Sequence, residues 1–210
     1  MHSLLHPVGA FNPLRASTVI VALLLASAAL VVAAALAMPA PYVWHVHSIS
    51  ESAAQGLQHA WIARLGFLSF GSAVLILALA CKRHWGRAAF WSHVAFAGLM
   101  LATAAFSHKP WLPGVPSDST EDLLHSITAT AMGFAFALGV AARLFERSRT
   151  QVWSRALDVV ALLAATLLSP IGALSPGIGG LLQRVMFGMA YLWYASEAIA
   201  YVTHSRRTDA

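Results

Sequence analysis

Ionisable side chains are scarce in this sequence, yet six of them gather where three apolar segments begin. They are expected at one edge of a membrane and comprise Glu51, His59, Arg64, Asp122, His125 and Arg184. Arginine and histidine donate hydrogen bonds to anions, and the N-terminus of a helix adds a partial positive charge. These residue types predict an outward-facing pocket that binds, and transports, an anionic lipid headgroup or a small anion.

Three of the same residues permit a different chemistry. His59, Asp122 and His125 could act as acid/base groups or metal ligands, which would make the protein a membrane-embedded hydrolase of a lipid-like substrate. His59, Asp122 and His125 do not form an HxxxH or HExxH motif, so no cofactor is predicted, and zinc or a haem bridged by His59 and His125 stands only as an alternative. A third alternative is an assembly partner without chemistry of its own. Helix capping and snorkelling at the interface are the purely structural explanation.

Two further carboxylates, Asp158 and Glu197, lie deep in the last two apolar segments, toward the opposite edge. A buried carboxylate is either neutral or paired, because desolvation penalises the charged form. Arg155 or the region of Arg143 is the expected partner of Asp158, whereas Glu197 has no evident partner. A proton-coupled role and a structural hydrogen bond are both open for Glu197.

The elements that carry these residues are membrane-spanning helices. The chain has 210 residues, of which 59% are hydrophobic and 10% charged, and its mean hydropathy is +0.69. Apolar stretches of about 20 residues span a bilayer as helices, which satisfy their own backbone hydrogen bonds. The sequence predicts an all-α, compact antiparallel bundle of six transmembrane helices at residues 16–38, 57–81, 88–107, 122–143, 154–170 and 181–203.

The distribution of basic residues predicts the orientation. Ten of the 13 Lys and Arg residues lie before the first segment, after the last one, or in the second and fourth connections. Such residues accumulate on the cytoplasmic side, so residues 1–15 and 204–210 are expected to be cytoplasmic tails around a transmembrane domain at 16–203. The expected location is a bacterial inner membrane and the expected partner is the lipid bilayer, not nucleic acid. Cleavage after Ala-Leu-Ala at 35–37 is an alternative for the first segment.

Local motifs suggest how the pocket would form. Ser52 with Gln55, and Ser119 with Asp122, have the spacing of capping boxes at helix starts. The loop SPIGALSPGIGG, at residues 169–180, is expected to add free backbone N–H groups. With the dipoles of three helix N-termini, these groups would favour an anion.

The layout resembles a bacterial integral-membrane family known as domain of unknown function 998. The resemblance spans residues 40–203 and is carried by the short motifs Ser50–Glu51, Leu124–His125 and Gly180-Leu-Leu-Gln183-Arg184. It implies a six-helix bundle with a shared cluster in the outer leaflet, and it implies no reaction. A weaker likeness is to the ceramidase and adiponectin-receptor class of zinc hydrolases, which have seven spans and an HxxxH pair on the last helix. This chain has only His204 at that end, so that zinc site does not transfer.

Overall fold

The computed structural model describes residues 12–208, with side chains described as far as residue 203, and this part of the chain is helical without a β-strand. Six long helices account for most of it: α1 (Pro13–Ala37), α3 (Ala60–Ala80), α4 (Arg87–Ala105), α5 (Ser119–Glu146), α6 (Val152–Leu174) and α7 (Gly179–Thr208). Each coincides with one of the six predicted segments. A short helix α2 (Ile49–Ser52) and two 3-10 turns, η1 (Cys81–Arg83) and η2 (Pro176–Ile178), were not expected.

Five of the long helices, α1 and α3 to α6, are long and apolar enough to cross a membrane. The described part of α7 contains Arg184 and Glu197, which lower its hydropathy, and it is not among those five. Helix α6 continues through Pro170 to Leu174, although proline removes one backbone hydrogen bond from a helix. The chain is therefore a helical protein with several apolar spans, as the composition indicates.

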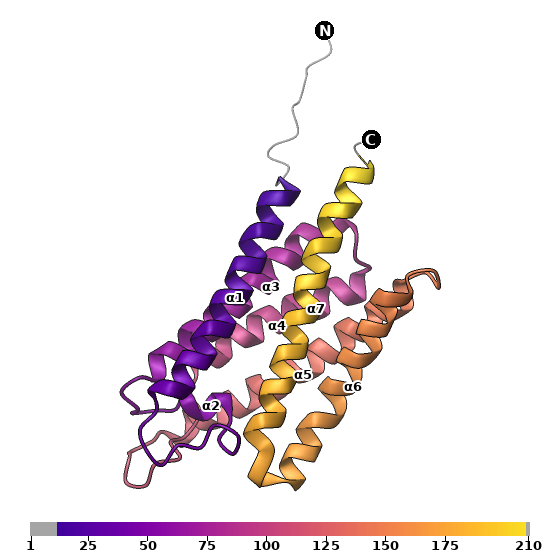
Figure 1. The fold of residues 1–210 in the computed structure, drawn as a ribbon. Coiled ribbons are helices and arrows are strands. Elements are labelled where there is room, and N and C mark those ends of the chain that lie inside the picture. Colours follow the sequence, from indigo (N-terminus) through magenta and orange to yellow (C-terminus); the bar gives the residue numbers. More distant parts are fainter. Residues whose placement is uncertain (1–11, 209–210) are drawn as a thin grey trace.

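The helices form a closed ring in chain order (Figure 1). Helix α1 packs against α3, α3 against α4, α4 against α5, α5 against α6, α6 against α7, and α7 against α1. Because neighbouring helices are antiparallel, α1 begins and α7 ends at the same end of the bundle. We call this the basic end, since η1, the α5–α6 connection and their arginines lie there. The opposite end, covered by α2 and residues 38–59 and 106–118, is the capped end.

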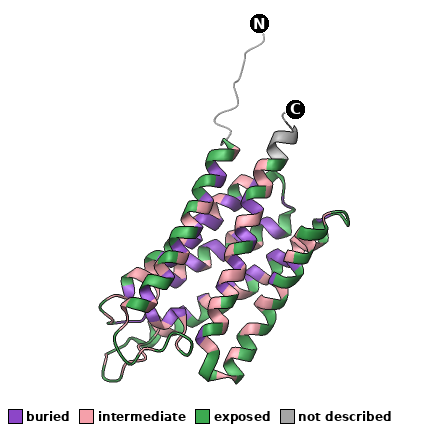
Figure 2. Ribbon diagram, viewed as in Figure 1, coloured by how far each residue is buried: buried purple, intermediate pink, exposed green. Residues whose placement is uncertain are grey.

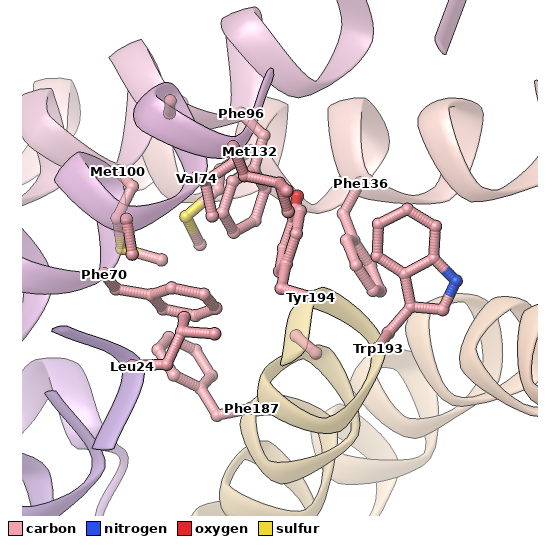
Figure 3. Close-up of a cluster of buried hydrophobic side chains, with 14 of the residues drawn as sticks. Leu24, Phe70, Val74, Phe96, Met100, Met132, Phe136, Phe187, Trp193 and Tyr194 are labelled. Carbon is pink, nitrogen blue, oxygen red and sulfur yellow. The ribbon is translucent and has the colours of Figure 1, made fainter. Parts of the chain in front are cut away.

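Aromatic side chains fill the centre of the ring. Phe70 of α3 stacks 4.5 Å from Tyr191 and 5.8 Å from Tyr194 of α7, measured between ring centroids. Phe96 and Phe136 bring α4 and α5 to the same cluster (Figure 3). Burial decreases outward (Figure 2), and α6 is the least enclosed helix, with only Asp158 and Ala161 buried. Exposed leucines and valines on the outer faces suit contact with lipid.

Candidate functional site

Arg184, expected to supply charge to an outer pocket, holds the chain of the capped end in place. Its Nη1 donates to the carbonyl oxygens of Trp44 (2.5 Å), His47 (2.8 Å) and Gly180 (2.9 Å). Its Nη2 donates to the hydroxyl of Tyr42 at 2.8 Å. Burial raises the pKa of Tyr42, and Arg184 offsets part of that rise, so the phenol stays neutral. The guanidinium therefore fastens residues 42–47 to the start of α7.

The backbone N–H groups at this helix start are also occupied. The N–H of Gly180 donates to the carbonyl of Val46 at 3.0 Å, and that of Leu181 donates to the carbonyl of His45 at 2.9 Å. A side chain at Gly180 would collide with the His47 carbonyl, so the close approach requires glycine. The expectation of free N–H groups in the 169–180 loop is wrong for Gly180, because a turn at residues 44–46 supplies carbonyls that cap the helix.

Arg64 and His59 lie at the start of α3. Arg64 Nε donates to the carbonyl of Ala53 at 3.2 Å and so holds the end of α2. His59 occupies the N-cap position without a side-chain cap bond and is half-buried. These two residues occur together at the helix start, as the sequence suggested, but the arginine contacts backbone.

Neither predicted capping box forms: α3 begins after His59, which makes no side-chain cap bond, and a capping box occurs instead at the short helix α2. Ser48 caps α2, and Glu51 Oε2 accepts from the Ser48 N–H at 2.6 Å. Asp118, not Ser119, caps α5, and its carboxylate accepts from the N–H groups of Thr120 and Glu121. Gln55 and Asp122 instead bond backbone groups of other loops. The Gln55 amide donates to the carbonyls of Ser107 and Asp118 and accepts from the Asp118 N–H. Asp122 accepts from the N–H of Lys109 at 2.8 Å. The chain thereby gains ties between separate loops.

His125 is buried at the start of α5 and joins it to the end of α4. Its Nδ1 lies 2.8 Å from the Phe106 carbonyl, while Nε2 has no hydrogen-bond partner. The His108 ring meets it edge-on at 5.5 Å, and His108 Nε2 lies 3.9 Å from Asp122. Within residues 12–203, no group of three or more His, Cys, Asp or Glu side chains is placed to hold a metal ion.

The residues of the predicted outer site thus make separate local contacts. In the described part of the chain, no hydrogen bond or ion pair joins any two of Arg64, His125 and Arg184. Each ties its own loop to a helix end. A common anion pocket formed by these residues stays a prediction, and Glu51, His59 and Asp122 are likewise held at separate positions.

A denser constellation lies at the basic end. We call Arg143, Glu146, Arg147, Asp158 and Glu197 the ionic cluster. Arg147 is its centre: Nε donates to Asp158 Oδ2 at 2.6 Å, and Nη2 donates to Asp158 Oδ1 at 3.3 Å and to Glu197. The side chains of Arg147, Asp158 and Glu197 are 4%, 0% and 3% exposed. Burial alone would lower the pKa of Arg147, but the two carboxylates more than offset this and hold it above its ordinary value.

The second arginine completes the cluster toward solvent. Arg143 Nε donates to Glu197 Oε2 at 3.2 Å, and its Nη1 donates to Glu146 Oε2 at 2.7 Å. The guanidinium also lies 5.6 Å from the ring of Trp85, whose indole N–H donates to Glu197 at 3.1 Å. Glu197 therefore accepts from three different side chains. Such saturation stabilises charge that would otherwise be costly to bury.

Asp158 pairs in the predicted region of Arg143, through Arg147, and does not pair with Arg155. Glu197, for which no partner was predicted, pairs with both Arg143 and Arg147. Asp158 binds Arg147 and the indole N–H of Trp193, which is 2.8 Å from Oδ1. Arg155 instead donates to the carbonyls of Leu144 and Arg147. Arg147 lies just after α5, so the direction of its side chain depends on the turn into α6, which sequence periodicity does not predict. The four-residue spacing of Arg143 and Arg147 was the sequence feature that could have indicated that both arginines serve one site.

His93 lies behind the ionic cluster, fully buried on α4. Its ring is 4.9 Å from Trp85 and 4.8 Å from Trp193, and Nδ1 is 2.9 Å from the Tyr194 hydroxyl. Nε2 has no hydrogen-bond partner. The ring fits against Gly139 of α5, where an added Cβ would stand 2.5 Å from Cε1. The two indoles that enclose His93 are those that donate to Glu197 and Asp158.

A cavity of about 400 Å³ opens beside the ionic cluster. Its wall combines the ends of α5 and α7 with η1, the connection from η1 to α4, and the start of α6. The lining includes Cys81, Trp85, Arg143, Glu146, Arg147, Gln151, Ser154, Glu197 and Tyr201. A second cavity, of about 320 Å³, lies between α6 and α7 near the capped end and has a less polar wall. Only the first joins a volume of ligand size to several buried charges.

Comparison with known proteins agrees with the architecture and adds no activity. No curated protein and no solved structure matches the chain. The sequence profile of one family, described as "Protein of unknown function (DUF998)", matches residues 19–200. That match covers α3 to α6 completely and most of α1 and α7. The chain therefore belongs to this DUF998 family.

Proposed function

We propose that the protein is a six-span inner-membrane protein that binds the phosphate group of a lipid headgroup, or a small phosphate-like anion, in the cavity of the basic end. The proposal keeps the class of ligand that the sequence suggests and moves its site from the capped end to the basic end. The observation that carries it is a cavity walled by two arginines that carboxylates hold in fixed positions.

The orientation is part of the proposal. Helix α7 has 30 residues, which is long enough to cross a bilayer, and Arg184 and Glu197 both have polar partners that reduce the cost of placing them there. The basic end carries Arg15, Lys82, Arg83, Arg87 and the arginines of the α5–α6 connection. Basic residues favour the cytoplasmic side, so both termini and the cavity would face the cytoplasm. Exposed Phe145 and Trp153 beside this cavity suit the membrane interface.

The two arginines retain donors for a ligand. Arg143 uses Nε and Nη1, and Arg147 uses Nε and Nη2, in their bonds to carboxylates. Arg143 Nη2 and Arg147 Nη1 have no partner among the described residues. Arginine donors in a fixed fork match phosphate oxygens, and the low local dielectric strengthens such bonds. The wall therefore supplies positioned donors at little further cost in side-chain entropy.

Native mass spectrometry of the protein released from phospholipid nanodiscs tests this function. We expect a phospholipid or a phosphate-containing ligand to stay bound, and Arg143→Gln to weaken its retention by about tenfold, because a hydrogen bond to a charged group is lost. Arg83→Gln removes the same charge from an exposed position outside the cavity and should leave retention unchanged. Equal retention in wild type and Arg143→Gln, with both folded by circular dichroism, would refute the proposal. A metal-free, ligand-free protein that retains a protein partner would favour an assembly role instead.

A further inference from the structure

The ionic cluster has more carboxylates than guanidinium groups. Arg143 and Arg147 pair with the carboxylates of Glu146, Asp158 and Glu197. With all five ionised, the cluster carries one excess negative charge. A ligand that brings a positive group to that charge, in addition to its phosphate, is therefore favoured over one that is only anionic.

The excess charge is located at Glu146. Asp158 accepts from Arg147 at both oxygens and from Trp193, and Glu197 accepts from both arginines and Trp85. Among the described residues, Glu146 accepts a hydrogen bond only from Arg143, through Oε2, and its Oε1 accepts none. Its side chain is 27% exposed and lines the cavity. Gly86 gives that carboxylate room, since a Cβ there would collide with it.

The cavity wall therefore presents opposite charges side by side. Unused N–H donors belong to Arg143 and Arg147, and an unused carboxylate oxygen belongs to Glu146, three residues from Arg143 on α5. Resting on the proposed phosphate site, we infer that the ligand is a phosphate ester that also carries a primary ammonium group. Its phosphate accepts from the two guanidinium groups, and its ammonium donates to Glu146.

The wall favours a primary over a quaternary ammonium. A carboxylate oxygen binds an N–H donor directly, which a trimethylammonium lacks. Quaternary ammonium groups are recognised mainly by open aromatic faces, and the Trp85 face in this cavity is already occupied by the Arg143 guanidinium. Two kinds of ligand carry both a phosphate ester and a primary ammonium group: the headgroup of an ethanolamine phospholipid and a soluble phosphoethanolamine-type compound.

The test is competition between headgroups on the full-length protein. Nanodiscs with equal amounts of phosphatidylethanolamine, phosphatidylglycerol and phosphatidylcholine are examined by native mass spectrometry, and phosphoethanolamine is titrated separately in detergent. We expect ethanolamine headgroups to be retained at least about tenfold over glycerol and choline headgroups. Glu146→Gln should abolish this preference and leave phosphatidylglycerol bound, whereas Glu121→Gln, the same substitution at the capped end, should preserve it.

Each outcome distinguishes the inference about the ammonium group from the proposed phosphate binding on which it rests. Binding of phosphoethanolamine that depends on Glu146, without lipid selectivity, supports the inference with a soluble source. Equal retention of the three lipids in wild type, still dependent on Arg143, overturns the inference and leaves the phosphate site standing. Ethanolamine selectivity that survives Glu146→Gln also overturns it. Absence of any phosphate-containing ligand in every arm overturns the proposed function as well.

Discussion

Replacing Arg147 by glutamine tests whether the ionic cluster is a set of ionised, mutually dependent groups. The side chain is 4% exposed and supplies three charge-assisted hydrogen bonds, two to Asp158 and one to Glu197. Its removal leaves the buried carboxylates of Asp158 and Glu197 with less positive charge to balance their own. Breaking a buried pair from one side costs about 3–5 kcal/mol of unfolding free energy, and we expect Arg147→Gln to fall in that range.

Reversible unfolding in mixed micelles, followed by far-ultraviolet circular dichroism, measures this loss. Asp158→Asn and the double variant complete a cycle, in which we expect a coupling energy of about 1–3 kcal/mol between the two sites. Arg149→Gln is the control, since it removes an exposed arginine two residues away and should change stability by less than about 0.5 kcal/mol. A loss below about 1 kcal/mol for Arg147→Gln, with no coupling, would mean that the carboxylates are protonated and that the reasoning about paired charges is wrong.

Two other substitutions test the packing that positions the candidate sites. Gly139→Ala should destabilise the bundle by about 1–3 kcal/mol, because the new methyl group would press on the His93 ring. Gly133→Ala has open space around it on the same helix and should be neutral or slightly stabilising; equal effects in thermal unfolding would contradict the close fit. Arg184→Gln should raise hydrogen exchange at residues 44–48 by at least about tenfold, because three carbonyls lose their shared donor. Lys109→Gln is its control, and unchanged exchange in Arg184→Gln would show that the segment is held by other contacts.

Hydropathy was sufficient to predict the helices. The apolar runs place all six long elements within a few residues, because a span of hydrocarbon imposes helical structure and a minimum length on the backbone. The helix starts were less accurate. Ser52 was expected to cap the second long helix, but α3 has no side-chain cap and Ser48 caps the short helix α2; at α5, Asp118 is the cap in place of Ser119. Several hydroxyl and carboxylate residues lie close together at these positions, and only packing decides among them.

The sites were harder to predict because contact partners depend on the arrangement of helices around the ring. Arg184 and Asp122 were expected to serve a ligand, yet Arg184 donates to loop carbonyls and Asp122 accepts from a loop N–H. Glu197 was recognised as buried without a partner, and its partners Arg143 and Arg147 lie about fifty residues earlier in the chain. Separation of that kind leaves no periodic signal in one sequence.

The order of helices around the ring has a consequence for how the protein is made. Most contacts between long helices join consecutive ones; the exceptions are the contacts of α7 with α1 and, in the centre of the ring, with α3 and α4. Each newly synthesised helix can therefore dock on its predecessor as it leaves the ribosome. The final helix brings Glu197, Trp193 and Tyr194 into the interior, and its contact with α1 closes the ring. A chain that stops before α7 would leave Arg143 and Arg147 without the Glu197 acceptor and Asp158 without the Trp193 donor. It would present an open, charged side to the bilayer, which is a signal for quality-control proteases.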